Sequence, residues 1–369
     1  MPLVCAERLS DGPVIEFDWT LTMPTPLVTA LIDTYNHERY IEQTLVSVLE
    51  QGLSSTELEI VVVDDGSTDN TPEIIRKFVP RVKHVRKANG GQASAFNVGV
   101  TEAHGEIIAT LDGDDWWAKG KVNAVVSAFE ADSKVPAVSH GYYEFHEETG
   151  EAKICVPSGR RLLSVETPEA IHEALMTWRY LPMGALTLRR NVMEWIMPIP
   201  EEMVFMADTA LQCAAIVMGT LVLDEPLLYY RHHAQNLYAV NAKDPAKLRR
   251  RSDMTELVYD RLYRRLMELG VPREKVVALL YPEWIRTRRF SLGTFGGSRL
   301  KTFRTEMDAF HLVYKHPSVG YRFFKYGIVG AATLLLPPRW FYYMRDLYWK
   351  RELGRLRDRL WKAEMTGSK

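Results

Sequence analysis

Three carboxylates crowd into the four positions 112–115, as Asp112, Asp114 and Asp115 around one glycine. They follow the apolar run Ile107 to Leu111, so a buried strand is expected to end abruptly in negative charge. Carboxylates this close repel one another unless a cation lies between them, and oxygen ligands suit Mg²⁺ or Mn²⁺. The segment therefore predicts a divalent metal site that bridges phosphate oxygens of a ligand, and a solvated acidic turn is the alternative.

A second polar cluster follows another apolar run. Residues 64–69 read Asp-Asp-Gly-Ser-Thr-Asp directly after Leu58 to Val63. An aspartate there can accept hydrogen bonds from a base or a ribose. The same residue types also favour an ordinary capped turn from a strand to a helix, so this cluster alone leaves both interpretations open.

The elements that must position these side chains alternate regularly along the first part of the chain. Expected strands are Leu27 to Ile32, Leu58 to Val63, Val82 to Val85 and Ile107 to Leu111, with helices at about 37–49, 72–79 and 92–103 between them. This alternation predicts an α/β fold with a mostly parallel sheet. Ligands bind such sheets outside the carboxyl ends of the strands, where both polar clusters fall.

The later part of the chain changes character. A helix is expected near 206–218 and two short strands at 221–223 and 227–230, and after about residue 240 apolar residues keep helical spacing among many Arg and Lys residues. We therefore expect an N-terminal extension at 1–24, a catalytic domain at 25–240 and a helical C-terminal region at 241–369.

Composition narrows the class of protein. The chain has 369 residues and a formal net charge of -1, so it has no general attraction for nucleic acid. Cys5, Cys155 and Cys213 are far apart and form no zinc or disulfide motif, which favours a reducing compartment. Glu7 and Asp11 stand where a signal peptide needs basic and apolar residues, so a cytoplasmic location is expected.

Taken in order, the motifs resemble those of the family 2 glycosyltransferases, whose catalytic domain has the nucleotide-sugar-binding fold called GT-A. The resemblance covers about residues 25–236. The matching segments are Thr34-Tyr35-Asn36, Val63-Asp64-Asp65-Gly66-Ser67, Asn89-Gly90-Gly91 with Asn97 and Gly99, Gly105-Glu106-Ile107-Ile108, Asp112-Gly113-Asp114-Asp115 and Tyr230-Arg231-His232-His233-Ala234-Gln235-Asn236. One such motif is weak, whereas the ordered set is specific.

The resemblance implies a role for individual positions. The nucleotide would be held by Asp33, Tyr35, Asp65, Asn97 and Asp112. A Mn²⁺ or Mg²⁺ ion on the donor diphosphate would be held by Asp114, Asp115 and His233. The donor diphosphate or acceptor pocket would be lined by Trp116, Trp117, Gly184 and Arg231. Aromatic faces suit the C–H face of a sugar, although core packing is the alternative for both tryptophans.

Asp208 is the expected general base, because the family places an acidic motif at the start of a helix beneath the acceptor. Ala207 departs from that motif, since many relatives have Glu there. A carboxylate here would take the proton of the acceptor hydroxyl and give inversion at the anomeric carbon. Capping of the helix is the alternative role for Asp208. A polyprenyl-phosphate sugar synthase and a non-catalytic nucleotide-sugar-binding module are the alternative functions.

The C-terminal region suggests contact with a membrane. Tyr326 to Pro338 carries no charge but is too short to span a bilayer, and Trp340-Phe341-Tyr342-Tyr343 and a basic tail follow it. Aromatic residues beside cations are typical of interfacial anchors. We expect residues 320–350 to lie on the inner face of the cell membrane, near a lipid-linked or glycan acceptor. A buried helical hairpin or a dimer contact is the alternative.

Overall fold

The computed structural model describes residues 28–166, 170, 174, 181–234, 236, 245–312 and 319–349. These residues fall into two compact units, the first within 1–239 and 261–279 and the second within 240–260 and 280–369. The extension predicted at 1–24 and the basic tail after Trp349 lie outside the described residues. The stretch 261–279 groups with the first unit, although a boundary near residue 240 assigns it to the C-terminal region.

A sheet of ten strands, counted over the described residues, forms the centre of the first unit. β1 (Val28–Thr34) pairs in parallel with β2 (Leu58–Asp64) and with β4 (Ile107–Asp112), and β3 (Lys83–Arg86) extends the parallel part beyond β2. β1, β2 and β4 are nearly continuous apolar runs because both of their faces are covered. The predicted parallel sheet is confirmed.

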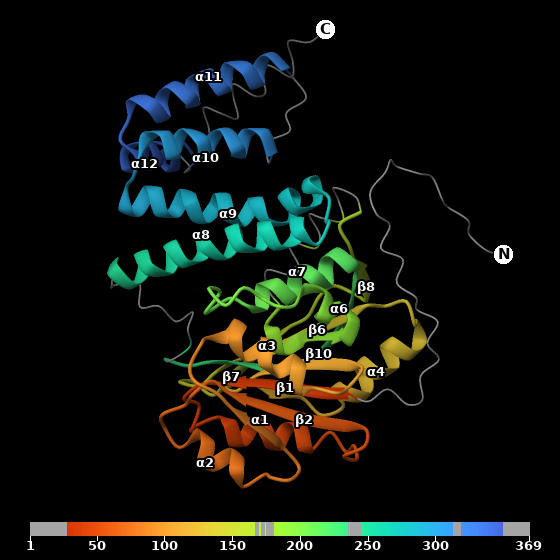
Figure 1. Cartoon of the computed structure of the whole chain (residues 1–369). Coiled ribbons are helices and arrows are strands. Elements are labelled where there is room, and N and C mark those ends of the chain that lie inside the picture. Colours follow the sequence, from red (N-terminus) through yellow and green to blue (C-terminus); the bar gives the residue numbers. More distant parts are fainter. Residues whose placement is uncertain are drawn as a thin grey trace, which may run out of the picture. The chain divides into compact units, whose positions relative to one another are not determined.

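Helices cover both faces of this parallel part (Figure 1). α1 (Ile41–Leu49) and α2 (Thr71–Arg76) share a buried cluster with one face of β1, β2 and β4. α3 (Gln92–Glu102) packs on the other face, where a Cβ added to Gly99 would lie 2.4 Å from Leu31 Cδ1. The glycine therefore permits close approach of α3 to the sheet.

The remaining strands make the sheet mixed. β9 (Leu186–Arg189) runs antiparallel between β4 and β6 (Ala137–His146), and β10 (Thr220–His232) runs parallel to β6. The sequence predicts two short strands where the structure has the single strand β10. Its register is irregular on either side of Pro226, which has no N–H to donate, so the break in the pattern marks a bulge.

Smaller elements complete the first unit. They are β5 (Trp116–Trp117), β7 (Glu151–Cys155), β8 (Arg161–Leu163), α4 (Lys121–Ala131), the 3₁₀ turn η1 (Met183–Ala185), α6 (Arg190–Ile196) and α7 (Asp208–Met218). A turn around Glu148-Thr149-Gly150 joins β6 to β7 in an antiparallel hairpin. Lys121 is fully buried at the start of α4 and donates its Nζ to the carbonyl oxygen of Gly184 at 2.6 Å.

The C-terminal region is helical, as predicted. α8 (Pro245–Glu268) and α9 (Arg273–Phe295) contribute to both units, and α10 (Arg299–Leu312), α11 (Val319–Leu335) and α12 (Pro338–Trp349) belong to the second. Leu292 of α9 packs with Phe341 and Tyr342 of α12 in a small apolar core. Among the described residues, no helix combines the length and the hydropathy needed to cross a membrane.

Candidate functional site

The carboxyl ends of β1 and β4 bring two of the predicted carboxylates together. The strands pair so that Asp33 lies opposite Asp112, and the backbone N–H of Gly113 donates to the Asp33 carbonyl oxygen at 2.9 Å. A Cβ added to Gly113 would lie 2.5 Å from Thr34 Oγ1 and 2.8 Å from His37 Nδ1. Only glycine therefore lets the turn after β4 lie this close to the turn after β1.

Asp114 is held between two imidazole rings. Its Oδ2 lies 2.9 Å from Nε2 of His233 and 4.0 Å from Nε2 of His37. The Nδ1 atom of His37 lies 3.2 Å from Thr34 Oγ1, so the ring is fixed on its far side and its Nε2 faces the carboxylate. His37 was not among the predicted site residues. Its only sequence signal was its place directly after Thr34-Tyr35-Asn36.

Asp115 and Arg231 form a neighbouring, more enclosed pair. Asp115 Oδ1 accepts the backbone N–H of Arg231 at 2.8 Å, and Arg231 Nε donates to the carbonyl oxygen of Asp114 at 2.7 Å. The Arg231 guanidinium also donates to Gln43 Oε1 and lies over the rings of Tyr40 and Trp116. Arg231 is 6% exposed, and its hydrogen bonds hold the turn at residues 114–115 in place.

Burial and the neighbouring charges shift the pKa values of these aspartates. Burial, with the charge of Asp114 next, raises the pKa of Asp33 to about 7. Burial, with the charge of Asp33 next, raises the pKa of Asp112 well above its ordinary value. Burial works in the same direction on Asp114, but the two imidazoles outweigh it and lower the pKa of Asp114. Asp114 is therefore the carboxylate that stays ionised most readily.

The residues fit a divalent cation that a ligand helps to hold. Asp33 Oδ1 and Asp115 Oδ2 are buried and have no hydrogen-bond partner among the described residues, so a positive group is missing beside them. The described residues contain no preassembled group of three or more metal-ligating side chains. Mg²⁺ and Mn²⁺ are commonly bound through one or two protein ligands together with phosphate oxygens and water.

The predicted nucleobase residues lie at the end of β2 and after β1. Asp65 is 4% exposed and accepts hydrogen bonds from Lys87 Nζ at 2.6 Å and from the backbone N–H groups of Gly90 and Gly91. Its carboxylate thereby fixes the loop before α3, and Lys87 supplies a cation there. The Tyr35 side chain is 44% exposed, so its ring is available to a ligand.

Asn97 has a different position from the one predicted. Its Nδ2 donates to the carbonyl oxygen of Ile199 and its Oδ1 accepts the Ile199 N–H, both at 2.8 Å. Both polar atoms of the side chain are therefore committed to the backbone of a distant loop. This geometry makes Asn97 a positioning residue and argues against a direct nucleotide contact.

The two tryptophans and Gly184 also fall mostly inside the protein. Trp117 is 2% exposed and belongs to the main apolar core, so it has no face for a sugar. Trp116 stacks on Tyr229 with ring centres 4.7 Å apart and also contacts the guanidinium of Arg231. A Cβ on Gly184 would lie 2.8 Å from Leu228, so this glycine serves packing below the site. Core packing thus explains Trp117 and Gly184.

Asp208 lies at the first position of α7 and is partly buried. Its Oδ1 accepts the backbone N–H of Thr209 at 2.9 Å, and Met206 before it has a left-handed φ of 61°. The N–H of Ala207 donates to Gln92 Oε1, which fixes this segment against the start of α3. Burial raises the pKa of Asp208 to about 6, and its charge in turn raises the pKa of Asp33 and of Asp112. Asp208 therefore lies close enough to Asp33 and Asp112 to interact with them electrostatically.

Comparisons with known proteins show which sequences and folds this chain is similar to. Residues 29–180 match the family model described as Glycosyl transferase family 2. An uncharacterised glycosyltransferase of Nostoc sp. is 33% identical over 57% of this chain and 66% of its own length. Chondroitin synthase of Pasteurella multocida is 40% identical over 31% of this chain and 12% of its own length. The chain thus matches less than two thirds of either relative.

A solved structure shares the fold. It is residues 1–349 of TarS from S. aureus in complex with UDP-GlcNAc, with a TM-score of 0.55 and 17% sequence identity over 84% of this chain and 90% of that one. At this identity the likeness concerns the fold: a mostly parallel sheet of the GT-A type followed by helices.

Proposed function

Because residues 29–180 belong to glycosyltransferase family 2, we propose that this chain transfers a sugar from a nucleoside-diphosphate donor to a hydroxyl group. The observation that supports this most is the convergence of Asp33, Asp112 and Asp114 with His233 at the carboxyl edge of the sheet. A UDP-sugar is the proposed donor, since the TarS fragment of the same fold binds UDP-GlcNAc. The proposed catalytic domain is residues 25–240.

The donor is proposed to lie along the carboxyl ends of β1, β2 and β4. Tyr35 and Asp65 flank the nucleobase, and Asp112 and Asp33 accept hydrogen bonds from the ribose. Asp114, Asp115 and His233 would hold Mn²⁺ or Mg²⁺, and His37 lies beside Asp114. The bound cation neutralises the diphosphate as negative charge develops on it.

Asp208 is proposed to act as general base from the start of α7. A carboxylate with a pKa of about 6 is ionised at neutral pH yet basic enough to accept the proton of an acceptor hydroxyl. The hydroxyl oxygen then forms a bond to the anomeric carbon while the bond to the diphosphate oxygen breaks. The nucleoside diphosphate leaves on the opposite face, so the configuration at that carbon is inverted.

The acceptor is proposed to be a glycan or a lipid-linked sugar on the cytoplasmic side of the membrane. The 40% identity to part of a chondroitin synthase supports a polysaccharide acceptor. Exposed apolar and aromatic side chains on α11 and α12, among them Leu335 and Trp340, support contact with a membrane surface.

The test is sugar transfer by the full chain. UDP-sugars, UDP-GlcNAc first, are supplied with Mn²⁺ and extracted lipid-linked or glycan acceptors, and released UDP is measured. Asp114→Asn is expected to lower turnover by about 100-fold or more, because charge stabilisation of the leaving group is lost. His232→Gln, at a half-buried neighbour that pairs with Glu144, is the control. Metal-dependent UDP binding without transfer to any acceptor would instead support a non-catalytic binding module.

A further inference from the structure

A groove of about 650 Å³ lies between α9 and α12 within the second unit. Its lining combines guanidinium groups with tyrosine rings, chiefly Arg286, Arg289, Arg339, Arg345, Tyr342 and Tyr343. α9 and α12 approach closely at Gly293, where an added Cβ would lie 3.2 Å from the Cβ of Tyr342. The carboxylate site described above uses none of these residues.

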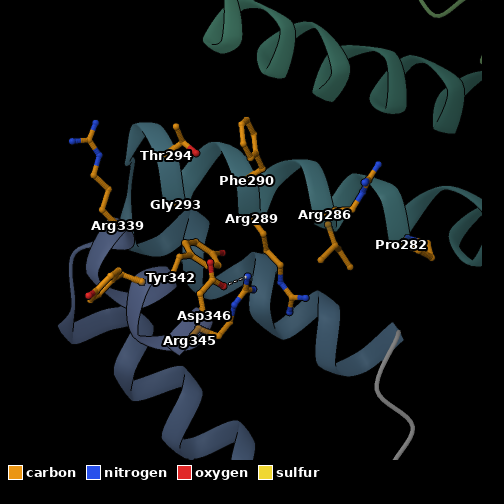
Figure 2. A pocket seen from close by; sticks show the side chains of 12 residues that line it. Pro282, Arg286, Arg289, Phe290, Gly293, Thr294, Arg339, Tyr342, Arg345 and Asp346 are labelled. Carbon is orange, nitrogen blue, oxygen red and sulfur yellow. Dashed lines mark hydrogen bonds and ion pairs between the residues drawn. The ribbon is translucent and has the colours of Figure 1, made fainter. Parts of the chain in front are cut away.

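The groove carries more positive charge than its own carboxylates neutralise. Arg289 donates to both oxygens of Glu306, at 2.8 and 2.6 Å, and Arg345 lies 3.3 Å from the same carboxylate. Figure 2 shows the guanidinium groups of Arg289 and Arg345 side by side. Glu306 is 3% exposed and pairs with both arginines. Asp346 lies 3.4 Å from Arg345, but it is exposed, so water screens this ion pair.

Arg339 differs from the other arginines of the groove, because it has no acidic partner among the described residues. Its Nη2 donates to the carbonyl oxygen of Phe295 at 3.2 Å, and the side chain is exposed. A neutral carbonyl leaves the guanidinium charge uncompensated. Guanidinium groups favour carboxylate and phosphate oxygens because their planar N–H groups match two oxygens at once.

Tyr342 places a buried hydroxyl beside these cations and beside the carboxylate of Glu306. Tyr342 is 2% exposed, and its hydroxyl interacts with Glu306. Burial, with the nearby charge of Glu306 next, raises its pKa, so the hydroxyl keeps its proton and can donate it in a hydrogen bond. An anionic oxygen in the groove can accept a hydrogen bond from this hydroxyl.

Apolar side chains that face solvent lie on α12, which lines the groove, and at the end of α11; we call this surface the apolar edge. Leu335 is 73% exposed at the end of α11, and Trp340 and Tyr343 of α12 are 63% and 58% exposed. The other exposed members are Leu334 of α11, Leu336 between the two helices, and Met344 and Leu347 of α12. Aromatic and aliphatic side chains next to arginines match a molecule with an anionic head and an apolar tail.

We propose that the groove between α9 and α12 binds the terminal phosphate of an anionic lipid, while the apolar edge enters the lipid around it. Arg339, Arg345 and the Tyr342 hydroxyl contact the phosphate. This inference deepens the proposed membrane contact and rests on it, but it is independent of sugar transfer.

Vesicle flotation of the full chain tests the site without any sugar donor. Phosphatidylcholine vesicles carry either phosphatidic acid, which has a terminal phosphate, or phosphatidylserine adjusted to the same measured surface potential. Stronger binding to phosphatidic acid is expected. Arg339→Gln is expected to weaken that binding about fivefold, the effect of one basic residue at an anionic surface. Tyr342→Phe leaves the charge unchanged and is expected to abolish the preference between the two lipids.

Arg304→Gln is the matched control, because Arg304 is an exposed arginine of α10 outside the groove. Equal binding to the two anionic lipids, or equal loss in the control, would overturn the proposal in favour of general charge attraction. Inorganic phosphate that stabilises the chain through Arg339, with no vesicle binding, would assign the groove to a soluble phosphate. A concentration-dependent dimer that Trp340→Ala dissociates, with no vesicle binding, would make this face a contact between copies.

Discussion

Asp114 and Asp112 are two residues apart, yet their surroundings give them opposite electrostatic properties. Two imidazoles face Asp114 and favour its ionised form, whereas Asp112 lies among other carboxylates. A bound divalent cation would change this balance by adding positive charge near these carboxylates. The site can therefore be tested in two ways, by measuring metal binding and by replacing the proposed general base.

Asp208→Asn tests the general base. We expect turnover to fall by about 100-fold or more with donor affinity unchanged, because only the proton acceptor is lost. The wild-type rate should fall as the pH drops below about 6, since protonation removes the base, and this acidic limb should vanish in the variant. Asp224→Asn, at an exposed aspartate of β10, is the control. A variant that keeps its turnover but melts at a lower temperature would show that Asp208 caps α7.

His37→Gln tests whether the imidazole of His37, which the sequence motifs did not predict as a site residue, supports metal binding. Its ring is held by Thr34 with Nε2 toward Asp114, so we expect Mn²⁺ binding in the presence of UDP to weaken by about 10-fold or more. Electron paramagnetic resonance of free Mn²⁺ measures this without turnover. His232→Gln, whose ring pairs with Glu144, should bind normally. Unchanged affinity in His37→Gln would limit His37 to packing beside Asp114.

At the scale of elements, the first residues of α3 position the loop that leads to Asp208 at the start of α7. A Cβ on Gly91 would lie 2.7 Å from Val204, the N–H of Gln92 donates to the Val204 carbonyl oxygen, and Asn97 holds both backbone groups of Ile199. One short helix thus fixes two points of the loop before α7. The geometry of the proposed base depends on these contacts.

Asn97→Ala removes the two hydrogen bonds to the backbone of Ile199. We expect the free energy of unfolding to fall by about 1–3 kcal/mol, since two partly buried backbone groups lose their partner. Urea unfolding followed by circular dichroism measures the change. Thr101→Ala, which removes a local hydrogen bond on the exposed side of the same helix, should stay within about 0.5 kcal/mol. Equal losses in the two variants would mean that Asn97 contributes no more than an ordinary surface residue.

At the scale of the whole molecule, ligand binding should be visible as stability. UDP with Mn²⁺ at 100 times its dissociation constant should stabilise the native chain by about 2.7 kcal/mol, because it binds only the folded state. A thermal-shift series of nucleotides with and without Mn²⁺ measures this. UDP without the cation, and the pair added to Asp114→Asn, should give a much smaller shift. An equal shift with and without Mn²⁺ would remove the metal from donor binding.

The parallel sheet, the helical C-terminal region and the segments that carry the carboxylates could all be predicted from the sequence. Short apolar runs that alternate with helical patterns indicate buried parallel strands, and polar residues directly after such strands fall at one edge of the sheet. The family followed from the order of those motifs. These features are local along the chain, so the pattern of residues suffices to predict them.

Only the tertiary structure decided which side chains meet. His37 and His233 are 196 positions apart in sequence and face the same oxygen of Asp114, while Asn97 and Trp117, which belong to the motifs or adjoin them, serve a loop and the core. The direction of a side chain depends on strand register and on neighbours far away in sequence, which no local pattern encodes. The groove between α9 and α12 arises in the same way, from two helices that meet only after folding.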